Sequence, residues 1–447
     1  MEGGLKAPIR HPHGYDELDY LNEDQLDAEL RRVFDICHGC RRCFNLCDSF
    51  PRLFELIDGS ESGELDTVSS KGFGHVIDGC TLCDMCFMVS CPYVPPHEFN
   101  IDFPHLVLRY RAIRFSKGFV SWGDRQLTKT DRNGKIGSML SWLANWSSRT
   151  SNRTMRTALE LLIGVDRNAA LPKYHRRTLV KHDELETQKP KPSSSDTGRK
   201  VALYATCFAN YNNPNIGIAA INVLQRNGVV CKVVYSECCG MPQLEQGGVG
   251  VVADKARTIS KELAPWIDNG YQIVPLVPSC TLMFKFEWPL LLPGDVNVQS
   301  LSRHTSDISE YIVGLSKAGE LVDGLSPLPG TVTAHLACHA RAQNIGPQAV
   351  EMLRLIPNVQ LAVIERCSGH GGAWGVKKGN FETALKIGKP AVRQALKLGS
   401  TFVVSECPLA GEHIRQGMEG VAGESHIVKH VSHPIELLAQ SYGFGKG

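Results

Sequence analysis

The sequence has no long hydrophobic run. No stretch of its 447 residues approaches the about 18 consecutive apolar residues that a membrane-spanning helix requires. The first residues also lack an apolar run of about 7–15 residues behind a basic patch, so we do not expect a cleaved secretory signal. These absences predict a cytoplasmic protein, which would meet a membrane only peripherally, on its inner face.

Cysteine is too sparse for a disulfide-stapled fold. The chain holds 16 cysteines in 447 residues, well below the roughly 8–10% of small secreted scaffolds. All of them except Cys231 stand in short, patterned groups, and we expect Cys231 to lie in the core. This grouping favours metal ligation in a reducing compartment.

The strongest pattern is a pair of cysteine runs in the first hundred residues. One run reads C-x2-C-x2-C-x3-C, the other reads C-x2-C-x2-C-x4-C, and Pro92 follows the second. In proteins with two cubane clusters, three close cysteines hold one cluster and the fourth cysteine of the run ligates the other. The predicted sets are Cys37, Cys40, Cys43 and Cys91 for one [4Fe-4S] cluster, and Cys80, Cys83, Cys86 and Cys47 for the second.

Zinc is the alternative ligand for these runs. Structural zinc prefers two C-x2-C pairs separated by a longer loop, which fits two runs of four cysteines less well. Leu26, Leu30, Val33 and Phe34 are spaced as one face of a helix behind an Asn22 cap, and a second helix is expected from 102 to 117. We therefore expect a mostly helical dicluster ferredoxin-type domain over residues 1–118.

Charge is divided unevenly along the chain. Residues 1–100 hold 8 Lys and Arg against 18 Asp and Glu, whereas residues 101–180 hold 15 against 5. The two segments could neutralise one another, or the basic segment could be a docking face for anionic lipid or an acidic partner. No nucleic-acid-binding motif accompanies the basic segment, so we expect no nucleic acid partner.

A basic helical connector is expected over residues 119–182. Ile136, Met139, Leu140 and Leu143 form a stripe at helical spacing, with Trp142 and Trp146 alongside. Such a stripe is typical of an interfacial membrane helix, but also of ordinary core packing. Residues 183–199 are polar and rich in Pro, Ser and Lys, which predicts a flexible linker.

The second half of the chain is duplicated. Strand-like apolar runs alternate with helical patterns, and each run is followed by a cysteine: Cys207, Cys238, Cys280, Cys338, Cys367 and Cys407. The first two spacings, 31 and 42 positions, recur as 29 and 40 in the second copy. We therefore expect two α/β domains with parallel strands, over residues 200–330 and 331–447, whose cysteines gather at the carboxyl ends of the strands.

Two further thiol sites follow from this placement. The first comprises Cys207, Cys238, Cys239 and Cys280, and the second, which is incomplete, comprises Cys338, Cys367 and Cys407. The alternative is that these cysteines are buried as small hydrophobic residues, which suits single residues better than a repeated set.

With both features the chain resembles the iron–sulfur C subunit of anaerobic glycerol-3-phosphate dehydrogenase and the B and C subunits of heterodisulfide reductase. The resemblance rests on the ferredoxin runs, the cysteine-rich repeat known as the CCG domain and the block CSGHGGAWGVKKGNFETALKIGKP. A complete CCG domain of that family reads C…CC…C-x2-C and holds a non-cubane cluster. Here Met283 replaces the last cysteine of the first repeat, and Ser368 and Ala410 stand in the second.

The resemblance implies one further iron–sulfur cluster in the first CCG domain and leaves a centre in the second undecided. In the second domain a histidine could complete the ligand set, because histidine can replace cysteine on iron. The candidates are His335, His339 and His370, and His370 is also the candidate catalytic residue.

The resemblance further implies an electron-transfer subunit that works between a flavin-containing dehydrogenase partner and a quinone or other redox acceptor. No G-x-G-x-x-G fingerprint opens a strand–helix unit, so we expect hydride chemistry to belong to the partner. One alternative is a self-contained reductase of a disulfide, peroxide or quinone at the CCG site. A more remote one is an iron–sulfur redox sensor or scaffold.

Overall fold

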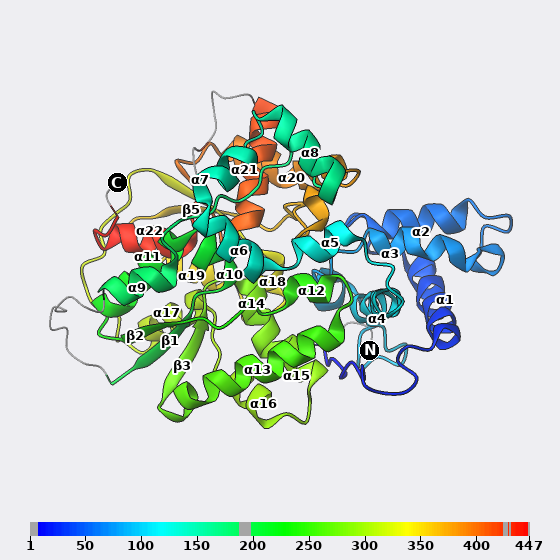
Figure 1. The fold of residues 1–447 in the computed structure, drawn as a ribbon, viewed down its shortest axis with the longest axis horizontal. Coiled ribbons are helices and arrows are strands. Elements are labelled where there is room, and N and C mark those ends of the chain that lie inside the picture. The colour runs from blue at the N-terminus through cyan, green and yellow to red at the C-terminus, as the bar shows by residue number, and fades with distance from the viewer. Residues whose placement is uncertain (1–7, 187–197, 423–427, 429–430, 446–447) are drawn as a thin grey trace.

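The computed structural model describes residues 8–186, 198–422, 428 and 431–445. A helical N-terminal part lies at one end of the molecule, and two small sheets lie in the remainder (Figure 1). The architecture confirms the predicted fold class, with a helical first part followed by two α/β domains with parallel strands.

The N-terminal part is made of helices and loops. Its elements are α1 (Glu23–Cys40), α2 (Ser49–Asp58), η1 (Leu65–Thr67), η2 (Ser70–Gly72), α3 (Phe73–Asp78), η3 (Cys86–Ser90) and α4 (Phe103–Ser116). The predicted Asn22 cap is confirmed, because its side chain accepts a hydrogen bond from the Gln25 amide at 3.1 Å. Asp102 caps α4 in the same way through the His105 amide.

The connector forms five helices. They are α5 (Trp122–Leu127), α6 (Thr130–Met139), α7 (Ser141–Ser147), α8 (Arg153–Ile163) and α9 (Leu179–Glu186). The predicted linker is corrected at its start, because residues 183–186 continue α9. Residues 187–197 of that predicted linker lie outside the described residues.

The apolar stripe of the connector faces outward. The helix breaks at Leu140, and α6 turns Gly134 and Gly137 inward, where a Cβ at Gly134 would lie 2.2 Å from the Tyr211 ring. Met139 is 69% exposed and Trp142 73% exposed. Core packing, one of the two interpretations of this stripe, is therefore wrong.

The two repeats have the same topology. The first comprises β1 (Lys200–Tyr204), α10 (Cys207–Tyr211), α11 (Pro214–Arg226), β2 (Val230–Val234), α12 (Met241–Glu245), α13 (Val249–Asp268), β3 (Tyr271–Pro275), α14 (Pro278–Leu282), η4 (Met283–Glu287), α15 (Trp288–Leu291), α16 (Val296–Arg303) and α17 (Ile308–Lys317). The second comprises β4 (Thr331–His335), α18 (Cys338–Arg341), α19 (Gln348–Leu353), β5 (Gln360–Ile364), η5 (Trp374–Val376), α20 (Phe381–Leu398), β6 (Phe402–Ser405), α21 (Pro408–Ala422) and α22 (Pro434–Ser441). The strand orders are β2-β1-β3 and β5-β4-β6, with parallel pairing throughout.

The duplication extends beyond the strands. In each repeat the last strand makes a parallel bridge to a later residue, Ile273 to Thr305 and Val404 to Ser432. The helix that follows each bridge begins with a capping box, built on Asp307 in α17 and on His433 in α22. The repeats therefore share their edges as well as their strand order.

Hydrophobic cores tie the three parts together. One core runs from Leu30 and Phe73 in the N-terminal part to Trp288 in the first repeat. A second core is shared between the repeats and includes Val201, Val332 and the predicted core residue Cys231. Because each core crosses a domain boundary, the relative positions of the cysteine sites are fixed by packing.

Candidate functional site

The eight N-terminal cysteines lie where helices end. Cys37 and Cys40 close α1, Cys43 and Cys47 follow in the turn before α2, Cys80 and Cys83 lie in the loop after α3, and Cys86 and Cys91 begin and follow η3. None of the sixteen cysteines, all of which lie among the described residues, forms a disulfide. The donor set therefore fits metal ligation better than disulfide bonding.

One group of four thiols draws on both cysteine runs. Burial raises the pKa of Cys37, and the thiols of Cys91, Cys43 and Cys40 raise it further. Burial also raises the pKa of Cys43 to about 12, with added contributions from Cys91 and Cys40. These four cysteines, the first ferredoxin set, lie together, and their role as ligands stays a prediction.

The second group is complementary. Burial raises the pKa of Cys47, and Cys80 and Cys83 raise it further. The pKa of Cys86 is raised by burial and then by Cys80, Cys83, Cys47 and, more weakly, Cys43. We name Cys47, Cys80, Cys83 and Cys86 the second ferredoxin set. The contribution of Cys43 places this set next to the first.

The loop of the second ferredoxin set is tightly wound. Leu82 and Asp84 both have left-handed backbone, with φ of 49° and 62°. Side chains other than glycine adopt this region at a cost, and such residues cluster at ligand sites. Leu82 and Asp84 stand between the cysteines of this loop, Cys80, Cys83 and Cys86. The turns at these two residues therefore bring the three thiols toward one another.

The first repeat holds four thiols in one hydrogen-bonded row. Cys207 adjoins Cys238, Cys238 adjoins Cys239, and Cys239 adjoins Cys280. Hydrogen bonds with the side chains of Cys207 and Cys239 lower the pKa of Cys238. Gly240, with φ of 89°, lets the chain turn directly after the pair. These four cysteines are the first repeat set.

A carboxylate from the connector supports this row. Asp131 of α6 accepts a hydrogen bond from the Cys238 amide at 2.9 Å and another from the Tyr235 hydroxyl. Sequence reasoning missed Asp131, because it lies 107 positions from Cys238 and no local pattern marks it.

The second repeat set has three thiols. Cys338 begins α18, Cys367 follows β5 and Cys407 follows β6. Burial raises the pKa of Cys338, followed by the thiols of Cys83, Cys367 and Cys407. Cys367 is exposed as a residue, but burial of its thiol still raises the pKa of this group.

The three candidate histidines differ in whether their ring nitrogens have hydrogen-bond partners. His335 uses Nδ1 toward Ser405 Oγ at 3.0 Å and Nε2 toward the Arg366 carbonyl at 3.1 Å. His339 likewise uses both nitrogens, toward Ser279 Oγ and the Leu82 carbonyl.

His370 alone of the three has a buried Nε2 without a hydrogen-bond partner among the described residues. Burial, with a smaller contribution from His413, lowers its pKa to about 3. His370 is therefore neutral near pH 7, which a metal ligand requires.

Neighbouring cysteine sets are connected by interactions between their thiols or between residues next to the cysteines. The thiol of Cys367 contributes to raising the pKa of Cys83 to about 12, after burial, so the second ferredoxin set adjoins the second repeat set. Ser279 Oγ and His339 Nδ1, which flank Cys280 and Cys338, are hydrogen-bonded at 2.8 Å. The four sets therefore form one contiguous series.

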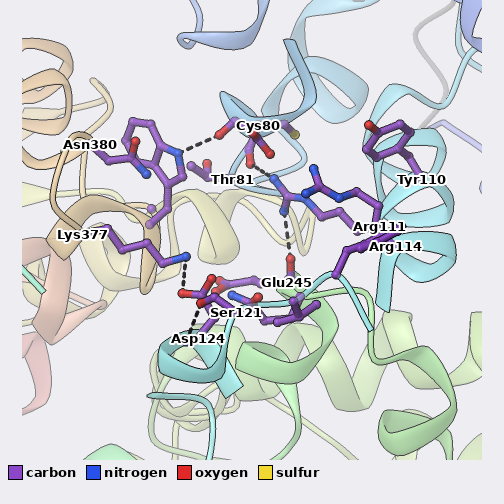
Figure 2. Close-up of a pocket in the computed structure, with 16 residues that line it drawn as sticks. Cys80, Thr81, Tyr110, Arg111, Arg114, Ser121, Asp124, Glu245, Lys377 and Asn380 are labelled. Carbon is purple, nitrogen blue, oxygen red and sulfur yellow. Dashed lines mark hydrogen bonds and ion pairs between the residues drawn. The ribbon is translucent and has the colours of Figure 1, made fainter. Parts of the chain in front are cut away.

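A pocket of about 370 Å³ opens where the N-terminal part, the connector and both repeats meet (Figure 2). Arg111 crosses it and donates to the carbonyl oxygens of Cys80 and Glu245. Trp374 Nε1 donates to the Asp78 carbonyl at 2.7 Å and joins the CSGHGG segment to the loop of the second ferredoxin set.

Glycines make this junction possible. A Cβ at Gly371 would lie 2.6 Å from Thr81 Cγ2, and one at Gly372 would lie 2.5 Å from Glu245 Oε1. Both glycines have positive φ. Larger residues would separate the second repeat from the pocket wall.

Glu245 is a second ionisable group that sequence reasoning missed. Burial raises its pKa to about 7, although Arg111 and the Ala373 amide pull it down. Glu245 interacts electrostatically with a thiol of each repeat. Cys238 of the first repeat raises the pKa of Glu245, and Glu245 raises the pKa of Cys407 in the second repeat. The segment CCGMPQLEQGG, which places an acid six positions after the cysteine pair, was the available sequence clue.

Among the described residues no helix is long and apolar enough to cross a bilayer. The cysteine-rich domain model named CCG matches residues 201–285 and 332–414, the two repeats of the structure. This match agrees with the repeated topology.

Three relatives extend the comparison. The C subunit of anaerobic glycerol-3-phosphate dehydrogenase from Escherichia coli is 28% identical over 319 residues, covering 70% of this chain and 76% of its own length. The D subunit of dihydromethanophenazine:CoB–CoM heterodisulfide reductase from Methanosarcina barkeri is 26% identical over 254 residues, covering 54% and 59%. An iron–sulfur protein of Methanocaldococcus jannaschii is 29% identical over 256 residues, covering 56% and 48%.

The duplicated cysteine-rich domain, the free thiols and these relatives agree with one another. The chain carries two copies of the cysteine-rich CCG domain, and it is similar to the C subunit of anaerobic glycerol-3-phosphate dehydrogenase and to the D subunit of heterodisulfide reductase.

Proposed function

We propose that this chain is an electron-transfer subunit that works between a flavin-containing dehydrogenase partner and a quinone or other redox acceptor. The observation that carries the proposal is the contiguity of the four cysteine sets, from Cys37 to Cys280, through Cys83, Cys338 and the Ser279–His339 hydrogen bond. A series of adjacent redox sites is what a chain needs to conduct electrons across itself. The flavin partner and the quinone come from the family resemblance.

The ligand assignments follow the four sets. The first ferredoxin set would hold one [4Fe-4S] cluster, the second ferredoxin set would hold another, and the first repeat set would hold a further iron–sulfur cluster. When bound, such clusters accept and release single electrons at potentials that hydrogen bonds and burial tune. Five of these cysteines are buried, Cys80, Cys86, Cys238, Cys239 and Cys280. A thiolate buried there is costly unless a bound metal balances its charge.

The second repeat set is a centre of lower ligand number. Its three thiols leave one position to a fourth donor. Of the three candidate histidines, His370 is the one whose Nε2 has no hydrogen-bond partner among the described residues. This set also lies between the second ferredoxin set and the first repeat set, so its occupancy would affect transfer between them.

The test uses the full chain, reconstituted anaerobically with iron and sulfide. Reduced by an external donor, it should pass electrons to a water-soluble quinone, and it should co-purify from its native cells with a flavin-containing dehydrogenase. A Cys338→Ser variant should slow this transfer while both ferredoxin-set spectra persist. Transfer that is unchanged in this variant would remove the repeat domains from the path.

The pocket favours a second candidate, a self-contained reductase. Reduction of a disulfide or a quinone consumes two electrons and two protons. A donor protein would supply the electrons, Glu245 would supply one proton at its place in the pocket wall, and solvent would supply the other (Figure 2).

Glu245→Gln separates the two candidates. A reductase that uses this pocket should lose at least about tenfold in turnover of its small-molecule acceptor, since a positioned acid typically contributes about 100-fold or more. Electron delivery to a protein acceptor should stay unchanged. Glu262→Gln, on the exposed face of α13, is the matched control.

A further inference from the structure

A buried group of three side chains lies outside all four cysteine sets. His13 comes from the N-terminal segment, His105 from α4 and Glu287 from the end of η4, next to α15. One ligand atom from each lies within 4.8 Å of the others. Their side chains are only 1%, 15% and 5% exposed.

The distances are wrong for hydrogen bonds. Glu287 Oε2 lies 3.5 Å from His13 Nε2 and 3.6 Å from His105 Nε2, beyond the usual 2.7–3.2 Å of an N–H···O bond. Both Nε2 atoms are buried without a hydrogen-bond partner among the described residues. Such buried polar atoms destabilise the fold when nothing else satisfies them.

The same distances suit ligands of one metal ion. Two donors bound tetrahedrally at about 2.0–2.2 Å lie about 3.4 Å apart, close to both separations here. The two imidazole rings also approach each other, with 3.8 Å between their centroids. A shared ion would hold Glu287 Oε2 close to the spacing that it already has from each histidine nitrogen, with all three donor atoms within 4.8 Å of one another.

Two of the remaining donor atoms have partners of their own. His105 turns Nδ1 toward Asp102 Oδ2 at 3.3 Å, and Glu287 Oε1 accepts from Arg10 Nη1 at 3.1 Å. Outer carboxylates and hydrogen bonds of this kind orient metal ligands and fix the histidine tautomer. Nε2 of His105 and Oε2 of Glu287 are thereby left for a metal.

The charge of the side chains around this group gives an independent reason to expect a bound cation. Arg10 forms ion pairs with Asp84, Asp102 and Glu287, so three carboxylates share one guanidinium. With neutral histidines the group carries a buried excess of two negative charges. Uncompensated buried charge is costly, and one divalent cation would balance it.

We infer that His13, His105 and Glu287 bind a divalent metal ion, and that zinc is the ion the donor set fits best. Two imidazole nitrogens and one carboxylate oxygen form a ligand set that zinc uses, and its fourth position takes water. A small cavity of about 10 Å³, lined in part by His105 and Glu287, is of the size of one water molecule.

The ion would be a structural clamp. Its ligands join the N-terminal segment, α4 and the first repeat, which are up to 274 positions apart in the sequence. Arg10, fixed by the same group, binds Asp84 between Cys83 and Cys86. The site would therefore hold the loop of the second ferredoxin set against the first repeat.

The test is elemental analysis and zinc X-ray absorption on the full chain, reconstituted with iron, sulfide and zinc and then freed of loosely bound metal. We expect about one zinc per chain, with a nitrogen and oxygen shell near 2.0 Å and no sulfur near 2.3 Å. Absence of retained zinc, or a sulfur shell, overturns the assignment.

Variants give a second, independent readout. His13→Ala and Glu287→Gln should each lower retained zinc at least tenfold, since each removes a ligand, whereas His11→Ala, which changes an exposed histidine, should retain it. Iron content and circular dichroism of each variant report folding. Wild-type zinc levels in a folded His13→Ala chain contradict the proposal.

Discussion

Cys239 occupies the middle of the thiol row of the first repeat. It adjoins both Cys238 and Cys280, and its carbonyl accepts a hydrogen bond from Trp288 Nε1 at 3.2 Å. Cys239→Ala should therefore remove about four irons and the spectrum of the first repeat centre, because a closed set loses one of its four ligands. Both ferredoxin-set signals in low-temperature paramagnetic resonance should remain.

Cys231→Ala is the matched control for this change. Cys231 is also buried, but it lies in the core shared between the repeats and outside every set. If Cys231→Ala loses iron as Cys239→Ala does, the loss reports damage to packing and not to ligation.

Glu245 should titrate near neutral pH. Burial raises its pKa from 4.5 to about 7, so the folded chain holds a proton that the unfolded chain has released between these values. Its contribution to stability therefore falls as pH rises through this window. Infrared difference spectra should show a protonated carboxyl band that fades with a midpoint near pH 7 and is missing in Glu245→Gln. A band with an ordinary midpoint near 4.5 contradicts this.

The roles of several single residues cannot be predicted from the neighbouring sequence. The cysteine runs and the departures at Met283, Ser368 and Ala410 are visible in the sequence, because metal ligation imposes short spacings. Glu245 and Asp131 acquire their roles only from side chains far along the chain, such as Arg111, which reaches Glu245 across 134 positions. No periodicity records such pairs.

Among the elements, α22 depends on a histidine cap. His433 Nδ1 accepts from the Ile435 amide at 3.2 Å, and burial lowers the pKa of this histidine to about 3. Because the unfolded histidine binds a proton below about 6.5, stability from this cap is full above that pH and is lost as pH falls toward 3.

Hydrogen exchange of the α22 amides should report this loss. At pH 5.5, after correction for intrinsic rates, wild-type opening should be about tenfold more frequent than at pH 7, which is one pKa unit of proton uptake. His433→Asn keeps a good cap without a titrating group, so its protection should change much less. Equal losses in both proteins would assign the effect to another group.

The exposed stripe of α6 and α7 is a candidate surface for an anionic membrane. Trp142 and its apolar neighbours lie within the segment that holds 15 Lys and Arg against 5 Asp and Glu. Trp142→Ser with Leu143→Gln should release the protein from anionic vesicles at low salt, where attraction is strongest. Binding by sedimentation is the measurement.

Val296→Ser, on the exposed start of α16, is the control for this pair. If the wild-type protein does not bind anionic vesicles at low salt, the stripe is a protein interface and not a membrane surface.

The sequence predicted the apolar spacing correctly but not the direction in which the stripe faces, because the inward face of α6 is made by Gly134 and Gly137 packing on tyrosine rings. Small residues that permit close approach carry no hydrophobic periodicity.

At the scale of the whole molecule, the duplicated α/β order was predictable, because strand and helix patterns repeat with the cysteines. The contacts between the parts were not. Trp374 reaches Asp78 across 296 positions, and Arg10 reaches Glu287 across 277. These contacts bring the cysteine sets into one series, and they arise from shared cores that no segment contains alone.

Each ferredoxin set is expected to draw ligands from both cysteine runs, and paired serine substitutions in the full chain distinguish this arrangement from one cluster per run. Cys47→Ser with Cys80→Ser changes one set, so iron should fall by about four and one of the two ferredoxin-set resonance signals should remain. Cys37→Ser with Cys47→Ser changes both sets, so both signals should be lost or altered. The opposite pattern, with one cluster lost when both changes fall in the same run, would contradict the account, as would zinc with no reducible signal in the wild-type chain.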